Sequence, residues 1–181
     1  MRYNKTFTLN GREVLFRNGE REDGAEVFDV FNRTHAETDY LLSYPDENSF
    51  TAEQEGEFLQ GQADSANALE LLAIADGKIV GSAGIEAVGG KYKLRHRADF
   101  GIAVLKEYWG LGIGRKLTEL CIEAARDAGY SQIELQAVAE NARAVEMYKK
   151  CGFVEYGRNP RGFNSRESGY QELVYMKLEL K

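Results

Sequence analysis

Two hydrophobic patterns alternate along the chain and predict a mixed α/β fold. Short stretches in which apolar and polar residues alternate predict strands. Two pairs of such stretches are separated by the dipeptides Asn10-Gly11 and Asp76-Gly77. Such dipeptides are preferred in two-residue hairpin turns, because both central positions need a positive φ. We therefore predict one hairpin over Phe7–Phe16 and a second over Leu69–Val88.

Apolar residues three and four positions apart predict helices. In the first third of the chain, one helix is expected over about Ala25–Arg33, with Asp23 as its N-cap. A second helix should follow the capping box Thr51–Gln54. Polar residues predict connections over His35–Tyr40 and over Gly61–Asn67.

A strand, a helix and another strand follow one another in the middle of the chain. The first strand is expected over about Leu94–Leu105, and the helix over Ile113–Ala128, where Gly129 ends it. The second strand contains the alternating apolar residues of Ile133–Ala137. A unit of this length should cross over right-handed and leave its two strands parallel.

The last part of the chain predicts a helix capped by Asn141 and ended by Gly152. We expect a short strand over Phe153–Tyr156, a loop over Gly157–Gly169 and a final strand over Val174–Leu180. The sequence shows no internal repeat, low-complexity tract or linker, so one domain over residues 1–181 is predicted.

Composition narrows the class of protein. The chain has 181 residues, 43% of them hydrophobic, which predicts a folded domain with a proper core. No apolar stretch approaches the roughly 20 residues of a membrane span, and the polar start does not resemble a signal peptide, so a cytoplasmic protein is expected. The net charge of −6 speaks against a nucleic-acid partner and slightly favours cationic ones.

Cysteine and histidine are scarce. Cys121 and Cys151 are too far apart for a Cys-x-x-Cys motif, and both fall in helical patterns, so free thiols are expected. The two histidines, His35 and His96, have no ligand-like neighbours. We predict no metal site.

The most specific local signal is a glycine-rich turn between the strand that begins near Leu94 and the following helix. Gly110, Gly112 and Gly114 open that helix, whose free N-terminal amides favour an anion such as a phosphate. The spacing excludes a Walker loop, and Arg115 stands where a dinucleotide motif needs its third glycine. A purely structural turn remains an alternative.

Two motifs resemble those of the GNAT superfamily of acyl-CoA-dependent N-acetyltransferases. Ile102–Val104 followed by Trp109–Gly114 resembles its motif A, in which Trp109 stands where the pattern has Gln or Arg. Asn141–Phe153 resembles its second signature, Asn-x-x-Ala-x-x-x-Tyr-x-x-x-Gly-Phe. The resemblance extends over about Val14–Leu180 and points to a bacterial branch near the ribosomal-protein and small-amine acetyltransferases.

The resemblance implies a single-domain α/β fold with a mixed, mostly antiparallel sheet flanked by helices. A central parallel strand pair should splay to hold coenzyme A, with the pyrophosphate on the amides of about residues 110–115. The acyl arm should pair with the strand end at residues 102–104, and an amide near Val104 or Leu105 should polarise the thioester carbonyl. The cofactor-binding residues so implied are Ile102, Val104, Trp109, Gly110, Leu111, Gly112, Gly114, Arg115, Asn141 and Tyr148.

Roles in catalysis follow from the same resemblance. Tyr148 is expected to donate a proton to the leaving thiolate, and the alternative is an ordinary core tyrosine. Relatives often carry a glutamate at the position of Gln136, which cannot act as a base. Glu134, two residues earlier on the same strand face, is our candidate, and ordered water is the alternative. The connection should place Glu37, Asp39 and Tyr40 over the cleft as substrate contacts, and the alternative for Glu37 and Asp39 is that they are plain surface charges.

The function so predicted is direct transfer of acetyl from acetyl-CoA to a primary amine, on a small molecule or a protein, without a metal. The family also suggests a homodimer. A non-catalytic acyl-CoA-binding regulatory protein is the alternative, and a nucleotide-binding module is a third, weaker one.

Overall fold

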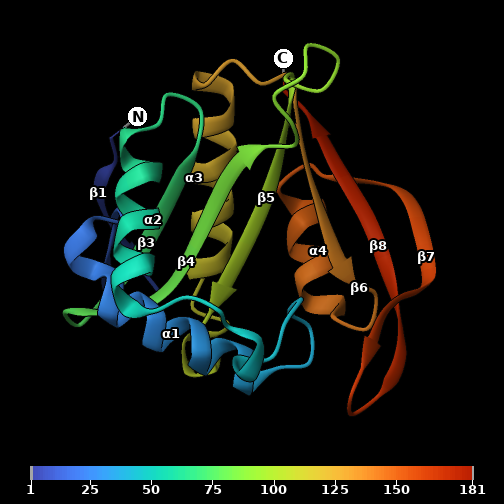
Figure 1. The fold of residues 1–181 in the computed structure, drawn as a ribbon, viewed down its shortest axis with the longest axis horizontal. Coiled ribbons are helices and arrows are strands. Elements are labelled where there is room, and N and C mark those ends of the chain that lie inside the picture. Colours follow the sequence, from blue (N-terminus) through green and yellow to red (C-terminus); the bar gives the residue numbers. More distant parts are fainter. Residues whose placement is uncertain (1, 181) are drawn as a thin grey trace.

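The computed structural model describes residues 2–180, which form one eight-stranded sheet covered by helices (Figure 1). The strands are β1 (Asn4–Leu9), β2 (Arg12–Asn18), β3 (Leu69–Ala75), β4 (Lys78–Ala87), β5 (Arg97–Val104), β6 (Gln132–Val138), β7 (Val154–Ser165) and β8 (Gly169–Glu179). The α-helices are α1 (Gly24–Glu37), α2 (Ala52–Asp64), α3 (Ile113–Asp127) and α4 (Ala142–Lys150). Short 3₁₀ turns lie at Arg21–Asp23, Pro45–Glu47 and Lys106–Tyr108.

The spatial order of the strands is β1-β2-β3-β4-β5-β6-β8-β7. Every neighbouring pair is antiparallel except β5 and β6, which run parallel as the crossover predicts. Helices α1 and α2 pack together over one face of the sheet, and α3 covers the other face with α4 beside it (Figure 1). No helix within residues 2–180 is long and apolar enough to cross a membrane.

Both predicted hairpin turns are present. Asn10 and Gly11 have φ of 48° and 80°, and Asp76 and Gly77 have φ of 52° and 74°, as the two central residues of such a turn require. The capping box of α2 is also confirmed, because Thr51 Oγ1 accepts from the Gln54 amide at 3.2 Å and Gln54 Oε1 accepts from the Thr51 amide at 2.9 Å.

Both N-terminal helices run further than the sequence predicts. Helix α1 continues to Glu37, so His35 is helical rather than part of a connection: its ring stacks on Phe31 with centroids 3.8 Å apart, and its Nδ1 lies 2.8 Å from the Phe31 carbonyl one turn earlier. Helix α2 continues to Asp64 through Gly61, because burial of Ala63 offsets the roughly 1 kcal/mol cost of a helical glycine.

The loop predicted over Gly157–Gly169 is wrong. This stretch forms most of β7, which pairs with β8 in a long hairpin at the edge of the sheet. Two register shifts absorb its irregular residues, one between Glu155 and Gly157 and one between Asn159 and Phe163. Bulges let an edge strand contain glycine and proline, so composition alone misleads here.

The parallel pair is short, and its end creates the central feature of the fold. Strand β5 pairs with β6 only where Arg97–Asp99 faces Gln132–Glu134. Beyond Asp99 the two strands separate, while β5 continues to pair with β4 as far as Val104. The predicted splay is therefore present.

Candidate active site

A cavity of about 340 Å³ opens where β5 and β6 separate. Its walls include Phe100–Ile102 from β5, Leu135–Val138 from β6, Asn141 at the N-cap of α4, and Tyr148 from that helix. A second cavity of about 570 Å³ lies under α1 and α2. The two share five lining residues, Leu41, Leu42, Asp99, Gly101 and Ile102, so they adjoin, and together they are called the cleft below.

The end of β5 presents free backbone groups to the splay. The Leu105 amide already donates to the Val80 carbonyl at 2.9 Å, on the β4 side. Since hydrogen-bonding direction alternates along an antiparallel ladder, the amides of Ile102 and Val104 point to the other side, toward β6. An amide donor at Leu105 is thereby excluded, and Val104 is left as the donor that faces the cleft.

The glycine turn forms a nest of amides at the start of α3. Gly110 and Gly112 have φ of 81° and 88°, a conformation that side chains rarely adopt, and Gly112 is the N-cap of the helix. None of the amides of residues 110–115 donates to an acceptor within residues 2–180, and the first helical bond runs from the Lys116 amide to the Gly112 carbonyl. Six free donors at the positive end of a helix suit a pyrophosphate.

The side chains of Trp109 and Arg115 have structural partners. Trp109 Nε1 donates to the Val104 carbonyl at 2.6 Å, and the Arg143 guanidinium stacks over its ring at 4.7 Å. Trp109 therefore holds the end of β5 in place, a role that Gln or Arg would not fill in the same way. Arg115 is exposed and bonds Glu119 one turn later, at 2.9 Å.

Tyr148 lies at the inner wall of the smaller cavity. Its ring packs edge-on against Phe100 and Phe153, and only 7% of the residue is exposed. Its hydroxyl makes no hydrogen bond to any residue that the structure describes, and burial raises the pKa of the phenol, so the proton is retained. Asn141 also lines the cavity, and its side chain accepts from the Ala144 amide at 3.3 Å as an N-cap.

Glu134, our candidate base, is engaged elsewhere. Its carboxylate accepts from Arg97 Nη2 at 2.6 and 2.8 Å, and from Gln132 Nε2 at 3.0 Å. It lies where β5 and β6 are still paired and lines neither cavity. This carboxylate is thus held by an arginine and does not reach the cleft.

Two of the expected substrate contacts also hold the protein together. Glu37 accepts from the Lys106 amide at 2.7 Å. Asp39 accepts from the hydroxyls of Ser165, Ser168 and Tyr44, which lower the pKa of its carboxyl and tie the loop after α1 to the β7–β8 hairpin. Tyr40 is different, because it lines the smaller cavity.

Asp99 is the carboxylate that sequence reasoning missed. It lines both cavities, at the point where the splay begins. Burial raises the pKa of its carboxyl, and the neighbouring carboxylates Glu134 and Glu86 raise it further. A signal was available, because Asp99 stands on the predicted strand immediately before the glycine motif, at a position facing Glu86 across the ladder.

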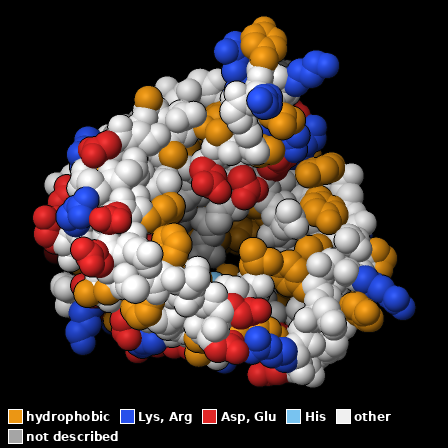
Figure 2. Space-filling model, viewed as in Figure 1, with side chains coloured by type: hydrophobic (Ala, Val, Ile, Leu, Met, Phe, Trp, Pro, Cys, Tyr) orange, Lys and Arg blue, Asp and Glu red, His pale blue; other side chains and the backbone are white. Residues whose placement is uncertain are grey.

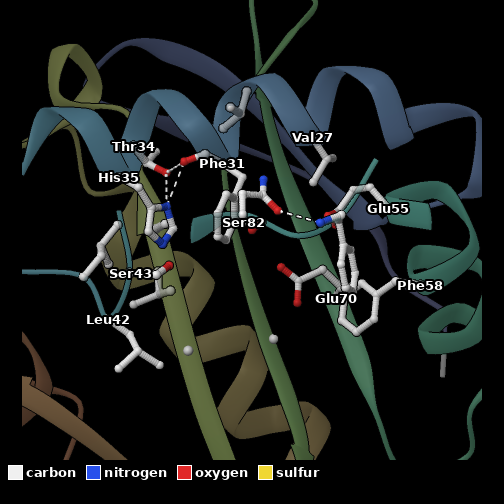
Figure 3. A pocket seen from close by; sticks show the side chains of 18 of the residues that line it. Val27, Phe31, Thr34, His35, Leu42, Ser43, Glu55, Phe58, Glu70 and Ser82 are labelled. Carbon is white, nitrogen blue, oxygen red and sulfur yellow. Dashed lines mark hydrogen bonds between the residues drawn. The ribbon is translucent and has the colours of Figure 1, made fainter. Parts of the chain in front are cut away.

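Acidic and apolar side chains lie along different edges of the opening of the cleft. Figure 2 shows a hollow in this face with Asp and Glu side chains along one edge and hydrophobic side chains along the others. Inside the larger cavity, Glu70 and Glu55 lie among Val27, Phe31 and Phe58 (Figure 3). Burial raises the pKa of Glu70 to about 7, and Glu55 and Glu86 add to the effect.

Comparison with known proteins gives consistent results. The family model described as "Acetyltransferase (GNAT) family" matches residues 24–153. The crystal structure of an acetyltransferase of the GNAT family from Streptococcus pneumoniae is 35% identical, with a TM-score of 0.87, over 92% of this chain and 99% of that one. The L-amino acid N-acetyltransferase AaaT of Escherichia coli (strain K12) is 27% identical over 91% of this chain and 96% of its own length.

A more distant structure shares the fold. The protein yncA from Salmonella typhimurium, solved with its cofactor acetyl-CoA, is 18% identical with a TM-score of 0.81, over 93% of this chain and 94% of that chain. The chain spans about half the length, or less, of some other curated acetyltransferases that it matches.

Proposed function

This chain belongs to the acetyltransferase (GNAT) family, and on that premise we propose that it transfers an acetyl group from acetyl-CoA directly to the primary amine of a small molecule. One observation carries the proposal: Tyr148 lines the cavity at the splay, the Val104 amide faces away from β4 on the strand that borders it, and the amides of residues 110–115 are free in the turn that follows this strand. Backbone and side-chain donors are thus available for a pyrophosphate, a thioester carbonyl and a leaving thiolate.

Acetyl-CoA, when bound, supplies the acetyl group as an activated thioester. The amides of residues 110–115 hold the pyrophosphate, and the backbone groups of Ile102 that face away from β4 align the acyl arm. The Val104 amide donates to the acyl oxygen as negative charge develops there, an interaction worth about 3 kcal/mol of barrier.

Asp99 replaces Glu134 as the proposed base. It borders both cavities, whereas Glu134 is bound to Arg97 below the splay. Its raised pKa brings the carboxyl closer to the operating pH, where a general base is most effective. Asp99 accepts the proton of the attacking amine, directly or through one water.

Tyr148 completes the transfer. As the nitrogen–carbon bond forms and the carbon–sulfur bond breaks, the hydroxyl of Tyr148 gives its proton to the thiolate and is later reprotonated from solvent. Neither Cys121 nor Cys151 lines a cavity, and burial raises the pKa of both thiols. Direct attack by the amine is therefore favoured over a covalent enzyme intermediate.

The test is a thiol-release assay with acetyl-CoA and a panel of primary amines, with the acetylated product identified by mass spectrometry. We expect release that depends on both substrates. Tight binding of coenzyme A, without turnover of any amine, would instead establish an acyl-CoA-binding regulatory protein.

A further inference from the structure

The larger cavity has a row of carboxylates along its floor. Glu86 of β4 faces Asp99 of β5 across the ladder, and Glu70 of β3 points into the open centre of the cavity (Figure 3). The residue that faces Glu70 is Gly84, where a Cβ would overlap the Glu70 carboxylate. The glycine therefore lets Glu70 extend across β4 toward the middle of the cleft.

Glu55 reaches the same cavity from α2. The residue is only 9% exposed, yet its carboxylate has no hydrogen bond or ion pair with any residue that the structure describes. Burial raises the pKa of its carboxyl. Because no oxygen of this side chain is both buried and unpaired, the free carboxylate faces the open space of the cavity, where a cationic ligand can supply the donor that the protein does not.

The rest of the cavity lining offers no positive charge. Neither Lys nor Arg is among the described residues that line it. The one histidine, His35, has its Nδ1 at the Phe31 carbonyl, and burial lowers the pKa of the ring, so Nε2 is left as an acceptor. Within residues 2–180 no group of acidic, histidine or cysteine side chains is arranged to hold a metal ion.

We propose that Glu55 and Glu70 form a subsite for a second cationic group of the acceptor, so that the natural acceptor is a diamine or longer polyamine without a carboxylate. This inference rests on the proposed function, because it assumes that the first amine is acetylated beside Asp99. An amino acid fits the cavity poorly, since five acidic residues line the cavity (Glu47, Glu55, Glu70, Glu86 and Asp99) and no Lys or Arg of its lining could pair with the substrate carboxylate.

The sheet sets the length of such an acceptor. Glu70 on β3 is level with Gly101 of β5, two strands away, and Asp99 lies two residues further along β5, so the two backbones are about 12 Å apart at the usual strand spacing and rise. An extended six-carbon diamine spans a comparable distance. Its methylene chain would run along the apolar wall formed by Val27, Phe31 and Phe58.

The test compares 1,6-diaminohexane with 1-aminohexane, which have the same chain and differ in the second amine. We expect kcat/KM to favour the diamine by about 10- to 100-fold, the range for hydrogen bonds to charged groups. Glu70→Gln and Glu55→Gln should each lower that ratio at least about fivefold. Glu53→Gln, on the exposed side of α2, is the matched control and should leave the ratio unchanged.

Direct binding gives a second readout that needs no turnover. Calorimetry should detect 1,6-diaminohexane with wild-type protein and weaker binding with Glu70→Gln, after thermal melting has shown that the variant is folded. The inference would be overturned if kcat/KM were equal for the diamine and the monoamine and if wild type and Glu70→Gln bound the diamine equally well. It would also be overturned if an amino acid with an apolar side chain, L-methionine, were a better substrate than the diamine. Absence of turnover with every amine, with diamine binding intact, would refute only the acetyltransferase proposal.

Discussion

The two halves of the cleft are built differently. On the cofactor side, between β5, β6 and the start of α3, the available groups are mostly backbone amides, at residues 110–115 and at Val104. On the acceptor side, under α1 and α2, they are side-chain carboxylates at Glu55, Glu70, Glu86 and Asp99. One half is neutral and rich in donors, whereas the other is anionic and rich in acceptors.

The difference has a physical consequence. Backbone amides are fixed by the helix and the turn, so in the proposed function they would recognise one group shared by every acyl-CoA. A substitution affects them only if it changes the backbone. Carboxylates are set by single residues, so the acceptor can change while the fold is kept. We therefore expect substitutions that strain the backbone to weaken binding in the cofactor half, and substitutions that remove a charge to weaken binding or catalysis in the acceptor half.

The strongest test of this division is Asp99→Asn, at the boundary of the two halves. Loss of a general base should lower kcat/KM about a thousandfold, while the affinity for coenzyme A stays within threefold. Steady-state kinetics and calorimetry measure the two quantities.

Glu134→Gln is the matched comparison for Asp99→Asn. It removes the partner of Arg97 and should lower the melting temperature, with kcat/KM changed less than threefold. A thousandfold loss in Glu134→Gln, with little loss in Asp99→Asn, would return the role of base to Glu134.

Gly112→Val tests the backbone half. A β-branched residue is strained at a φ of 88°, so the nest should distort and the Kd for coenzyme A should rise about 100-fold. Gly129→Val is a control with the same strain, because Gly129 has a φ of 82° at the other end of α3. Equal loss of coenzyme A affinity in both variants would show that the effect is general destabilisation.

Tyr148→Phe should lower kcat by about 10- to 100-fold, with little change in KM or melting temperature. Stability should be kept because the hydroxyl has no protein partner within the described residues. Tyr130→Phe is the converse control: the Tyr130 hydroxyl donates to the Asn67 carbonyl at 2.8 Å, so its loss should cost about 1 kcal/mol of stability and leave the rate intact. Full activity of Tyr148→Phe at every pH would exclude the phenol as the acid.

The backbone of the half proposed for the cofactor could be predicted from sequence because its signals are local. The glycines at 110, 112 and 114 lie within five residues, and Asn141 and Tyr148 share one short helix. Fixed spacing in a short segment specifies the local backbone, and the backbone provides the binding groups. The hairpin turns and the parallel strand pair were predictable for the same reason.

The acceptor half depends on contacts between distant segments. Glu55, Glu70 and Asp99 come from a helix and two strands, and each resembles an ordinary surface charge until the sheet register brings them together. One signal was present in Glu70, a lone carboxylate within the apolar strand β3. The ion pair of Glu134 could not be predicted from sequence either, because its partner Arg97 belongs to the neighbouring strand.

The smallest expected effect concerns pH on the acceptor side. The pKa of Glu70 is raised to about 7, so its carboxylate is mostly protonated at pH 6 and mostly charged at pH 8. Glu55 from α2, Glu86 from β4 and, across the sheet, Cys121 are its titratable neighbours, and none of them supplies a positive charge. The ratio of KM for 1-aminohexane to KM for 1,6-diaminohexane should therefore rise about tenfold from pH 6 to pH 8.

The monoamine corrects for deprotonation of the reacting amine and for titration of Asp99, because both substrates share those steps. Glu70→Gln should flatten the profile, since the amide carries no charge at either pH. A ratio that rises equally in wild type and in Glu70→Gln would assign the pH dependence to Glu55, whose carboxyl pKa is also raised by burial. A ratio that falls with pH would mean that the cavity does not bind a second cation, because an anionic subsite gains affinity as its carboxylates ionise.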